Sequence, residues 1–190
     1  MKKIIFILSA MLLFVQLSAQ TSDYQNLGNG TNNRVFLDII SKAGTINGDW
    51  GLFGGMRAGY NFNKQLSLGI VAHGLIPEQI EDNYINRDGR EDMHLGYGGI
   101  EASYNYSLAN DLYLTTAMMV GAGRVELETR NDNDYFFIIE PGASINYSFF
   151  DWFALGYSIN YRLASGVNYL NYSNASFSGW SMDLGFKFSF

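Results

Sequence analysis

The segment Trp180–Phe190 alternates strictly between apolar residues and polar or small residues. Successive side chains of a β-strand point to opposite faces, so this pattern predicts a strand with one wholly apolar face. That face must be covered by a protein core or by lipid, which limits the folds open to the chain. The apolar positions are Trp180, Met182, Leu184, Phe186, Phe188 and Phe190.

The same period of two recurs in seven earlier segments, so the sequence predicts eight strands. In the fifth segment the pattern slips near Gly123, and Pro141 in the sixth cannot donate to a ladder, which predicts a bulge or bend there. The predicted strands span Arg34–Lys42, Trp50–Tyr60, Gln65–Gly74, Leu95–Tyr106, Leu112–Leu127, Tyr135–Tyr147, Phe153–Leu163 and Trp180–Phe190.

The connections between these strands alternate in length. Three are short turns, at Asn61–Lys64, Ser107–Asp111 and Ser148–Trp152, and the others are longer loops, at Ala43–Asp49, Leu75–His94, Glu128–Asp134 and Ala164–Ser178. Short periplasmic turns alternating with longer outer loops are typical of outer-membrane barrels. We therefore predict an all-β fold, an eight-stranded antiparallel up-and-down transmembrane β-barrel with both termini periplasmic. A strand of about eleven residues, tilted near 40°, would cover about 28 Å, close to the apolar band of such barrels.

The N-terminal residues predict export. Lys2 and Lys3 precede the apolar run Ile4–Leu17, and small residues follow up to Gln20, which is the layout of a secretory signal peptide. We expect cleavage after Ala19, which divides the chain into a signal peptide (1–19), an N-terminal periplasmic segment (20–33) and the barrel (34–190). Beyond residue 20 no apolar run approaches the roughly 18 residues of a spanning helix.

Composition favours a membrane barrel over a soluble one. A lipocalin-like barrel also alternates, with its apolar face inward, but its wet exterior would carry many charges, and only 16% of this chain is charged. Aromatic residues gather near the predicted strand ends, as in the interfacial girdles of membrane barrels. A net charge of −6 makes nucleic acid a poor partner, and the absence of cysteine excludes disulfides and thiolate chemistry.

Charged residues within the strands share the polar parity and are expected to face the interior. Side chains just fill an eight-stranded barrel, so these charges must pair. Glu140 and Arg162 lie on neighbouring predicted strands, and closure of the barrel would bring Asp38 and Asp183 near Lys42, Lys187 or Arg34; which of these pairs form depends on the strand register, which the sequence does not give. The predicted interior charge network comprises Arg34, Asp38, Lys42, Arg57, Glu101, Glu140, Arg162, Asp183 and Lys187.

The chain resembles the small eight-stranded barrels of the outer-membrane protein A and X type, and is similar to uncharacterised outer-membrane β-barrel proteins from Bacteroidetes. Glycine-rich stretches carry this resemblance, together with the aromatic final residue, and the last strand resembles the C-terminal assembly signal of such proteins, formed here by Leu184, Phe186, Phe188 and Phe190. The resemblance implies the cell outer membrane of a Gram-negative envelope and contact with the barrel-assembly machinery, and it implies no reaction. The stretches are Gly51–Tyr60, Val120–Gly123, Ile139–Gly142 and Tyr161–Gly166.

Three functions remain open from the sequence. The first is a non-enzymatic structural or surface-binding protein, in contact with the lipid bilayer, lipopolysaccharide and an extracellular ligand of unspecified identity, with no cofactor. The second is a lipid-modifying enzyme, in which His73 and His94 are the two histidines that could act as catalytic residues. The third is a very narrow, porin-like transport channel. Carboxylates of the second long loop could bind divalent cations, or form an ordinary solvated acidic loop; they are Glu78, Glu81, Asp82, Asp88, Glu91 and Asp92.

Overall fold

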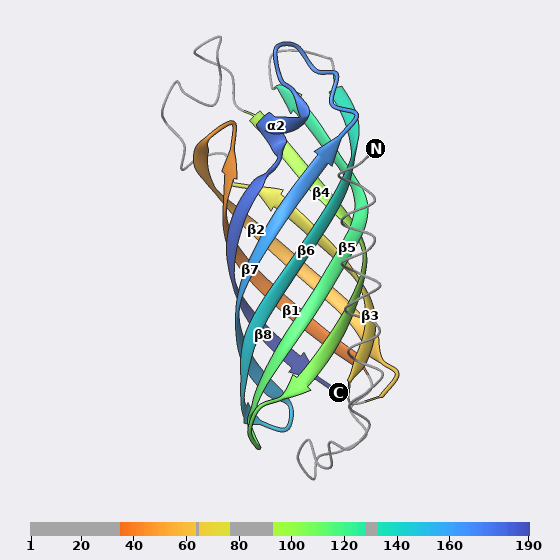
Figure 1. The fold of residues 1–190 in the computed structure, drawn as a ribbon, viewed down its shortest axis with the longest axis vertical. Helices are drawn as coiled ribbons and strands as arrows, with labels where there is room; N and C mark the ends of the chain where they lie inside the picture. Colours follow the sequence, from red (N-terminus) through yellow and green to blue (C-terminus); the bar gives the residue numbers. More distant parts are fainter. Residues whose placement is uncertain (1–34, 64, 77–92, 128–132) are drawn as a thin grey trace.

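The computed structural model describes residues 35–63, 65–76, 93–127 and 133–190, and in them eight strands form one closed barrel (Figure 1). Each strand pairs antiparallel with the next along the chain, and the first pairs with the last. The predicted all-β, up-and-down architecture is therefore confirmed. The strands are β1 (Val35–Ile46), β2 (Asp49–Asn61), β3 (Leu66–Leu75), β4 (Met93–Ser107), β5 (Leu112–Leu127), β6 (Asn133–Phe150), β7 (Phe153–Ser165) and β8 (Gly179–Ser189).

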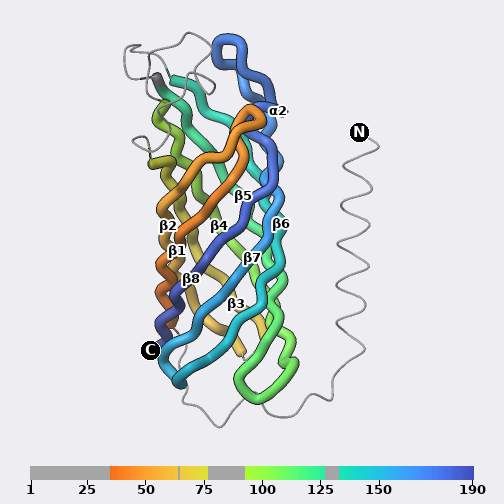
Figure 2. The backbone as a smooth tube through the Cα atoms, turned by 90° about the vertical axis from the view of Figure 1, so that its left-hand side faces the viewer, coloured from red at the N-terminus to blue at the C-terminus, as the bar shows by residue number. Residues whose placement is uncertain are grey.

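The barrel has two dissimilar ends (Figure 2). At one end, here called the apical end, lie the β1–β2 hairpin and the single-turn helix α2 (Asn174–Phe177). At the other, the basal end, lie the start of β1 and the end of β8, where Val35 and Phe190 exchange backbone hydrogen bonds of 3.3 and 2.9 Å. No helix within the described ranges has both the length and the apolar character needed to cross a membrane.

The first apical connection differs from the prediction of a longer loop at Ala43–Asp49. β1 continues to Ile46, and a two-residue turn of Asn47 and Gly48 leads directly into β2. Both turn residues have positive φ, 52° and 96°, the conformation that Asn-Gly adopts most readily in a type I′ hairpin. The turn chemistry of Asn-Gly, rather than the loss of alternation after Lys42, marks the true strand end.

Pro141 does not shift the register of β6. The pairing with β7 passes from Ile139 opposite Leu163 to Gly142 opposite Asn160, so the two intervening residues leave the ladder while the register stays the same. Of the expected bulge or bend at Pro141, the bulge is absent from the register, and the irregularity there is a two-residue gap in the β6–β7 pairing. The register shift of this strand pair lies instead between Ser148 and Phe150, beside the tight basal turn of Asp151 and Trp152.

The alternation predicted which side chains point inward. In β1, for example, Val35 and Ile39 are exposed, whereas Asp38 and Lys42 are buried. The slip of the hydropathy pattern near Gly123 does not correspond to a slip in register, because β5 keeps one register with both neighbours throughout. The hydropathy pattern changes there because the inner face becomes apolar at Val125, while the outer face carries an ion pair between Arg124 and Glu126.

β4 and β5 approach each other closely where two glycines lie opposite, Gly99 and Gly121. A Cβ at position 121 would overlap the carbonyl oxygen of Gly98, and no side-chain rotation could relieve a clash with backbone. Gly74, by contrast, has open space around the position of a Cβ.

We therefore expect Gly121→Ala to destabilise the barrel by about 1–3 kcal/mol, the usual cost of overpacking, and Gly74→Ala to leave stability nearly unchanged. Urea unfolding of both variants in detergent micelles, followed by tryptophan fluorescence, measures the difference. Equal midpoints for the two variants would show that the β4–β5 contact is not as tight as described.

Candidate functional site

The middle of the barrel interior holds charged side chains. Of the nine predicted interior charges, Arg34 lies outside the described residues, and the others all lie on the inward parity of their strands. Arg57 and Lys187 are partly buried. The remaining six are buried: Asp38, Lys42, Glu101, Glu140, Arg162 and Asp183.

Lys42 is the centre of a first ion cluster, and it is 1% exposed. Its Nζ lies 2.5 Å from Glu140 Oε1, across the barrel on β6, and 3.7 Å from Asp183 Oδ2 on the adjacent strand β8. Each carboxylate has a second polar partner, because the Tyr97 hydroxyl donates to Glu140 Oε2 at 3.1 Å and the Asn160 amide donates to Asp183 Oδ2 at 2.7 Å. The cluster ties β1 to β4, β6, β7 and β8.

Arg57 is the centre of a second ion cluster, closer to the basal end. Its Nη1 lies 3.0 Å from Asp38 Oδ2 and its Nε lies 2.9 Å from Glu101 Oε1. Asp38 also stands opposite Lys187 in the β1–β8 register, and the Lys187 ammonium lies 4.4 Å from the centre of the Phe36 ring. Every charge in this cluster therefore has an opposite charge or an aromatic face beside it.

Arg162 does not form the candidate pair with Glu140. Its Nε donates to the carbonyl of Phe177 at 2.6 Å and its Nη2 to the carbonyl of Thr45 at 2.7 Å. The guanidinium also lies 5.4 Å from the centre of the Phe53 ring and 5.1 Å from that of Tyr97. The five donors of the guanidinium allow Arg162 to bind two carbonyl oxygens at once, and Glu140 pairs with Lys42 instead.

An apolar plug, which the alternation pattern does not predict, fills the apical part of the interior. The plug combines inward side chains from the apical ends of the strands with two residues of the β7–β8 connection. Arg162 donates a hydrogen bond to the backbone carbonyl of Phe177, one of these two residues. The sequence signal for this plug is the loss of alternation near Gly123 and at the start of β6. At the start of β6 both faces of the strand are apolar. The plug includes Ile46, Phe53, Leu75, Met93, Leu95, Val125, Phe136, Ile138, Tyr169 and Phe177.

Uncharged polar side chains occupy the basal part of the interior. The Thr115 hydroxyl donates to Asn105 Oδ1 at 2.7 Å and accepts a hydrogen bond from the Asn146 amide at 3.0 Å. Ser67 donates to Asn61 Oδ1 at 2.7 Å. The interior thus changes along its axis from hydrogen-bonded amides and hydroxyls, through ion pairs, to the apolar plug.

The other predicted site residues do not belong to the two ion clusters. His73 is buried beside Tyr97, with ring centres 5.0 Å apart, whereas His94 is exposed at the start of β4. Leu184, Phe186 and Phe190 point outward from the last strand and its end, on the same parity as Phe188.

The acidic positions 78, 81, 82, 88, 91 and 92 and the predicted segments 1–19 and 20–33 lie outside the described residues. Among the described residues no three His, Asp or Glu side chains gather as a metal site would require.

Comparison with known proteins identifies the fold. No protein-family model and no curated protein matches the sequence. Among solved structures, Neisserial surface protein A matches with a TM-score of 0.63 at 12% identity, over 86% of this chain and 100% of that one. The N-terminal β-barrel domain of Pseudomonas aeruginosa OprF matches with a TM-score of 0.56 at 15% identity, over 83% of this chain and 98% of that one. The outer membrane protein OprG of Pseudomonas aeruginosa matches with a TM-score of 0.53 at 12% identity, over 87% and 99%.

The chain therefore has the fold of the small eight-stranded outer-membrane β-barrels. The resemblance to outer-membrane proteins seen in the sequence is confirmed at the level of fold. At these low identities the likeness concerns the backbone fold alone. It gives no information about the roles of the interior side chains of this chain.

The Lys42 cluster predicts a large cost for removing one partner. We expect Glu140→Ala to destabilise the folded barrel by about 3–5 kcal/mol, because it leaves the buried Lys42 ammonium without its nearest carboxylate. Glu126→Ala, which breaks the exposed pair with Arg124, should cost less than about 1 kcal/mol. Urea unfolding in micelles measures both, and Glu140→Gln should fall between them. If Glu140→Ala unfolds at the same urea concentration as the wild type, the pair contributes nothing.

Proposed function

We propose that this chain is an integral outer-membrane protein whose closed barrel is non-enzymatic and non-conducting, and whose role is structural or surface-binding. The observation that carries the proposal is an apolar band of side chains on the outside of the barrel, together with an interior that is filled. An apolar exterior of this extent in water would favour aggregation, whereas hydrocarbon solvates it.

The apolar band runs around the whole barrel. Every strand contributes outward aliphatic or aromatic side chains, and many of them expose 40% of their surface or more. Its central members include Ile39, Met56, Ile70, Ile100, Val120, Ile145, Ile159 and Met182.

Aromatic residues border the apolar band at both ends. Towards the apical end Trp180 packs edge-on against Tyr161, with ring centres 4.9 Å apart, and Trp50 lies on the outer face of the first hairpin. At the basal end Trp152 stacks on Phe150 with ring centres 5.6 Å apart. Aromatic side chains at both borders of an apolar band are typical of interfacial girdles.

The filled interior supports a closed barrel. The apolar plug occupies the apical part, Arg162 ties the plug to β1 through the Thr45 carbonyl, and the two ion clusters occupy the middle. Eight strands leave room only for side chains. A passage for solutes would require breaking buried ion pairs and exposing the plug.

The remaining parts of the proposal follow from the sequence. A cleaved signal peptide would export the chain, the outward residues Leu184, Phe186, Phe188 and Phe190 would present an assembly signal to the barrel-assembly machinery, and the basal end would face the periplasm. The apical end would then face the cell exterior among lipopolysaccharide molecules, where the loops could meet a ligand. A catalytic role for His73 has little support, because that side chain is buried inside the barrel beside Tyr97.

The lipid-facing band predicts an asymmetric effect of added charge. Ile159, at the centre of β7, and Leu170, in the apical β7–β8 connection, are each 46% exposed. We expect Ile159→Arg to destabilise the barrel by about 2–4 kcal/mol, because the charge would lie in hydrocarbon, and Leu170→Arg to have little effect.

The readout is the heat-modifiable folded form on gels, measured in the outer-membrane fraction of expressing cells. Ile159→Arg should reduce this form and Leu170→Arg should not. Equal amounts of folded protein for both variants, or a purified mature chain that stays folded and monodisperse without detergent, would contradict a membrane location.

The filled interior also predicts the absence of stable channels. Purified wild-type barrel in planar bilayers should produce no reproducible single-channel currents, because ion clusters and the apolar plug block the axis. Phe177→Ala, which removes a fully buried ring from the plug, should be more permeable than the wild type if any current appears. Large, regular wild-type currents would refute the closed-barrel proposal and favour the narrow channel.

A further inference from the structure

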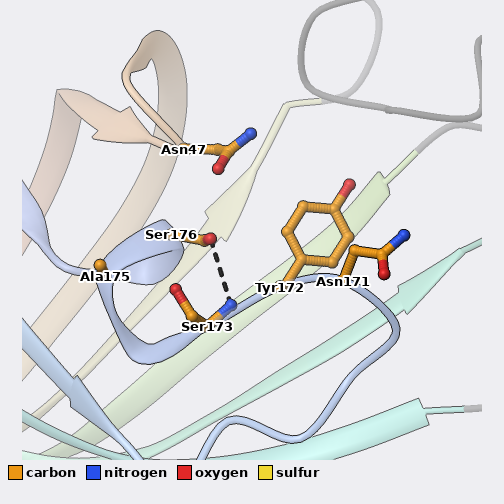
Figure 3. Close-up of a pocket in the computed structure, with 6 residues that line it drawn as sticks. All are labelled: Asn47, Asn171, Tyr172, Ser173, Ala175 and Ser176. Carbon is orange, nitrogen blue, oxygen red and sulfur yellow. Dashed lines mark hydrogen bonds between the residues drawn. The ribbon is translucent and has the colours of Figure 1, made fainter.

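We propose that a pocket on the apical rim binds a neutral carbohydrate. The pocket has a volume of about 340 Å³ and lies between the β1–β2 hairpin and the β7–β8 connection (Figure 3). Its lining comprises Asn47, Asn171, Tyr172, Ser173, Ala175 and Ser176.

The chemistry of the lining selects the class of ligand. Two carboxamides and two hydroxyls line the pocket, and each of these groups can both donate and accept hydrogen bonds, as sugar hydroxyls require. Tyr172, whose half-buried ring also contacts Tyr169 and Phe177, adds an amphipathic aromatic side chain to the lining. Among the residues that the structure describes, no charged side chain lines the pocket, so these residues supply neither the cation that a phosphate or sulfate needs nor the carboxylates that a metal ion needs.

The two carboxamides are available for a ligand. The side chains of Asn47 and Asn171 form no hydrogen bond within the described ranges, and Figure 3 shows both beside Tyr172 around the pocket. A ligand could therefore use their donors and acceptors without breaking a hydrogen bond to any described residue.

The walls of the pocket are held in place by the fold. The Asn47 backbone N–H donates to the Ser176 carbonyl at 2.6 Å, which joins the hairpin to α2, and the Ser173 N–H donates to the Ser176 hydroxyl at 3.2 Å. Tyr172 packs on Phe177, a member of the apolar plug, with ring centres 5.5 Å apart. A site whose walls are already ordered loses little conformational entropy when it binds.

The apical position suits such a ligand. If the apical end faces the cell exterior, as the proposed function holds, the pocket is presented to glycans of the surroundings or of the cell's own surface. The inference rests on the proposed function for this orientation alone, since binding by the isolated barrel does not depend on it.

The test uses the purified full barrel in detergent micelles on an array of neutral, sialylated and sulfated oligosaccharides, followed by calorimetric titration of the best neutral oligosaccharide. We expect binding to neutral members. Asn171→Ala and Asn47→Gly should each weaken the titrated Kd roughly three- to tenfold, the usual effect of one lost hydrogen bond. Glycine suits position 47 because Asn47 has a φ of 52°, so the turn should persist.

Asn168→Ala is the matched control, because Asn168 is an exposed amide of the same connection that does not line the pocket; its Kd should equal that of the wild type. The heat-modifiable gel shift verifies that each variant is folded. Binding to no neutral oligosaccharide, binding to anionic members only, or equal Kd values for the pocket variants and the control would each overturn the proposal. If micelle binding holds but intact cells do not bind the same oligosaccharide, the carbohydrate site stands and the proposed orientation fails.

Discussion

The pairing of β1 with β8 is the constraint on which the rest of the structure depends. Without this seam the sheet would have two open edges, and neither lipid nor an apolar interior can satisfy unpaired backbone groups. Two charged cross-strand pairs coincide with the seam, Asp38 opposite Lys187 and Lys42 opposite Asp183. The same residues belong to the two ion clusters, so the pairing that closes the barrel also brings opposite charges of the interior side by side.

The interior changes in polarity along the barrel axis, and this change is the reason for proposing a closed, non-conducting barrel. Ion pairs such as Lys42–Glu140 are stable away from water only because each charge has its partner and further hydrogen bonds. The apolar plug closes the apical part, and Arg162 joins it to the barrel wall through backbone carbonyls. Under the proposed function, a barrel filled in this way uses its surfaces rather than a pore: the outer wall contacts lipid and the apical rim contacts a ligand.

Much of the fold could be predicted from hydropathy alone, because the period of two determines which side chain of a strand points inward. The predicted strand ends were less accurate. Alternation fades before the Asn47–Gly48 turn begins, so hydropathy predicts a longer loop there. Pro141 leaves the β6–β7 ladder, but the register shows no bulge at this position. At Gly123 the apolar inner face made a continuous strand look irregular, since residues above the lipid band no longer need an apolar exterior.

The sequence by itself determined that the chain forms eight strands, that each has an apolar outer face and that ionisable residues share the inner face. These properties depend on neighbours two residues apart, so they can be recognised in a single chain. Only the tertiary structure decided that Lys42 meets Glu140, 98 residues away, and that Arg162 binds carbonyls of α2 and β1. Such partners depend on strand register and on what crosses the barrel axis, and register is set by all eight strands together.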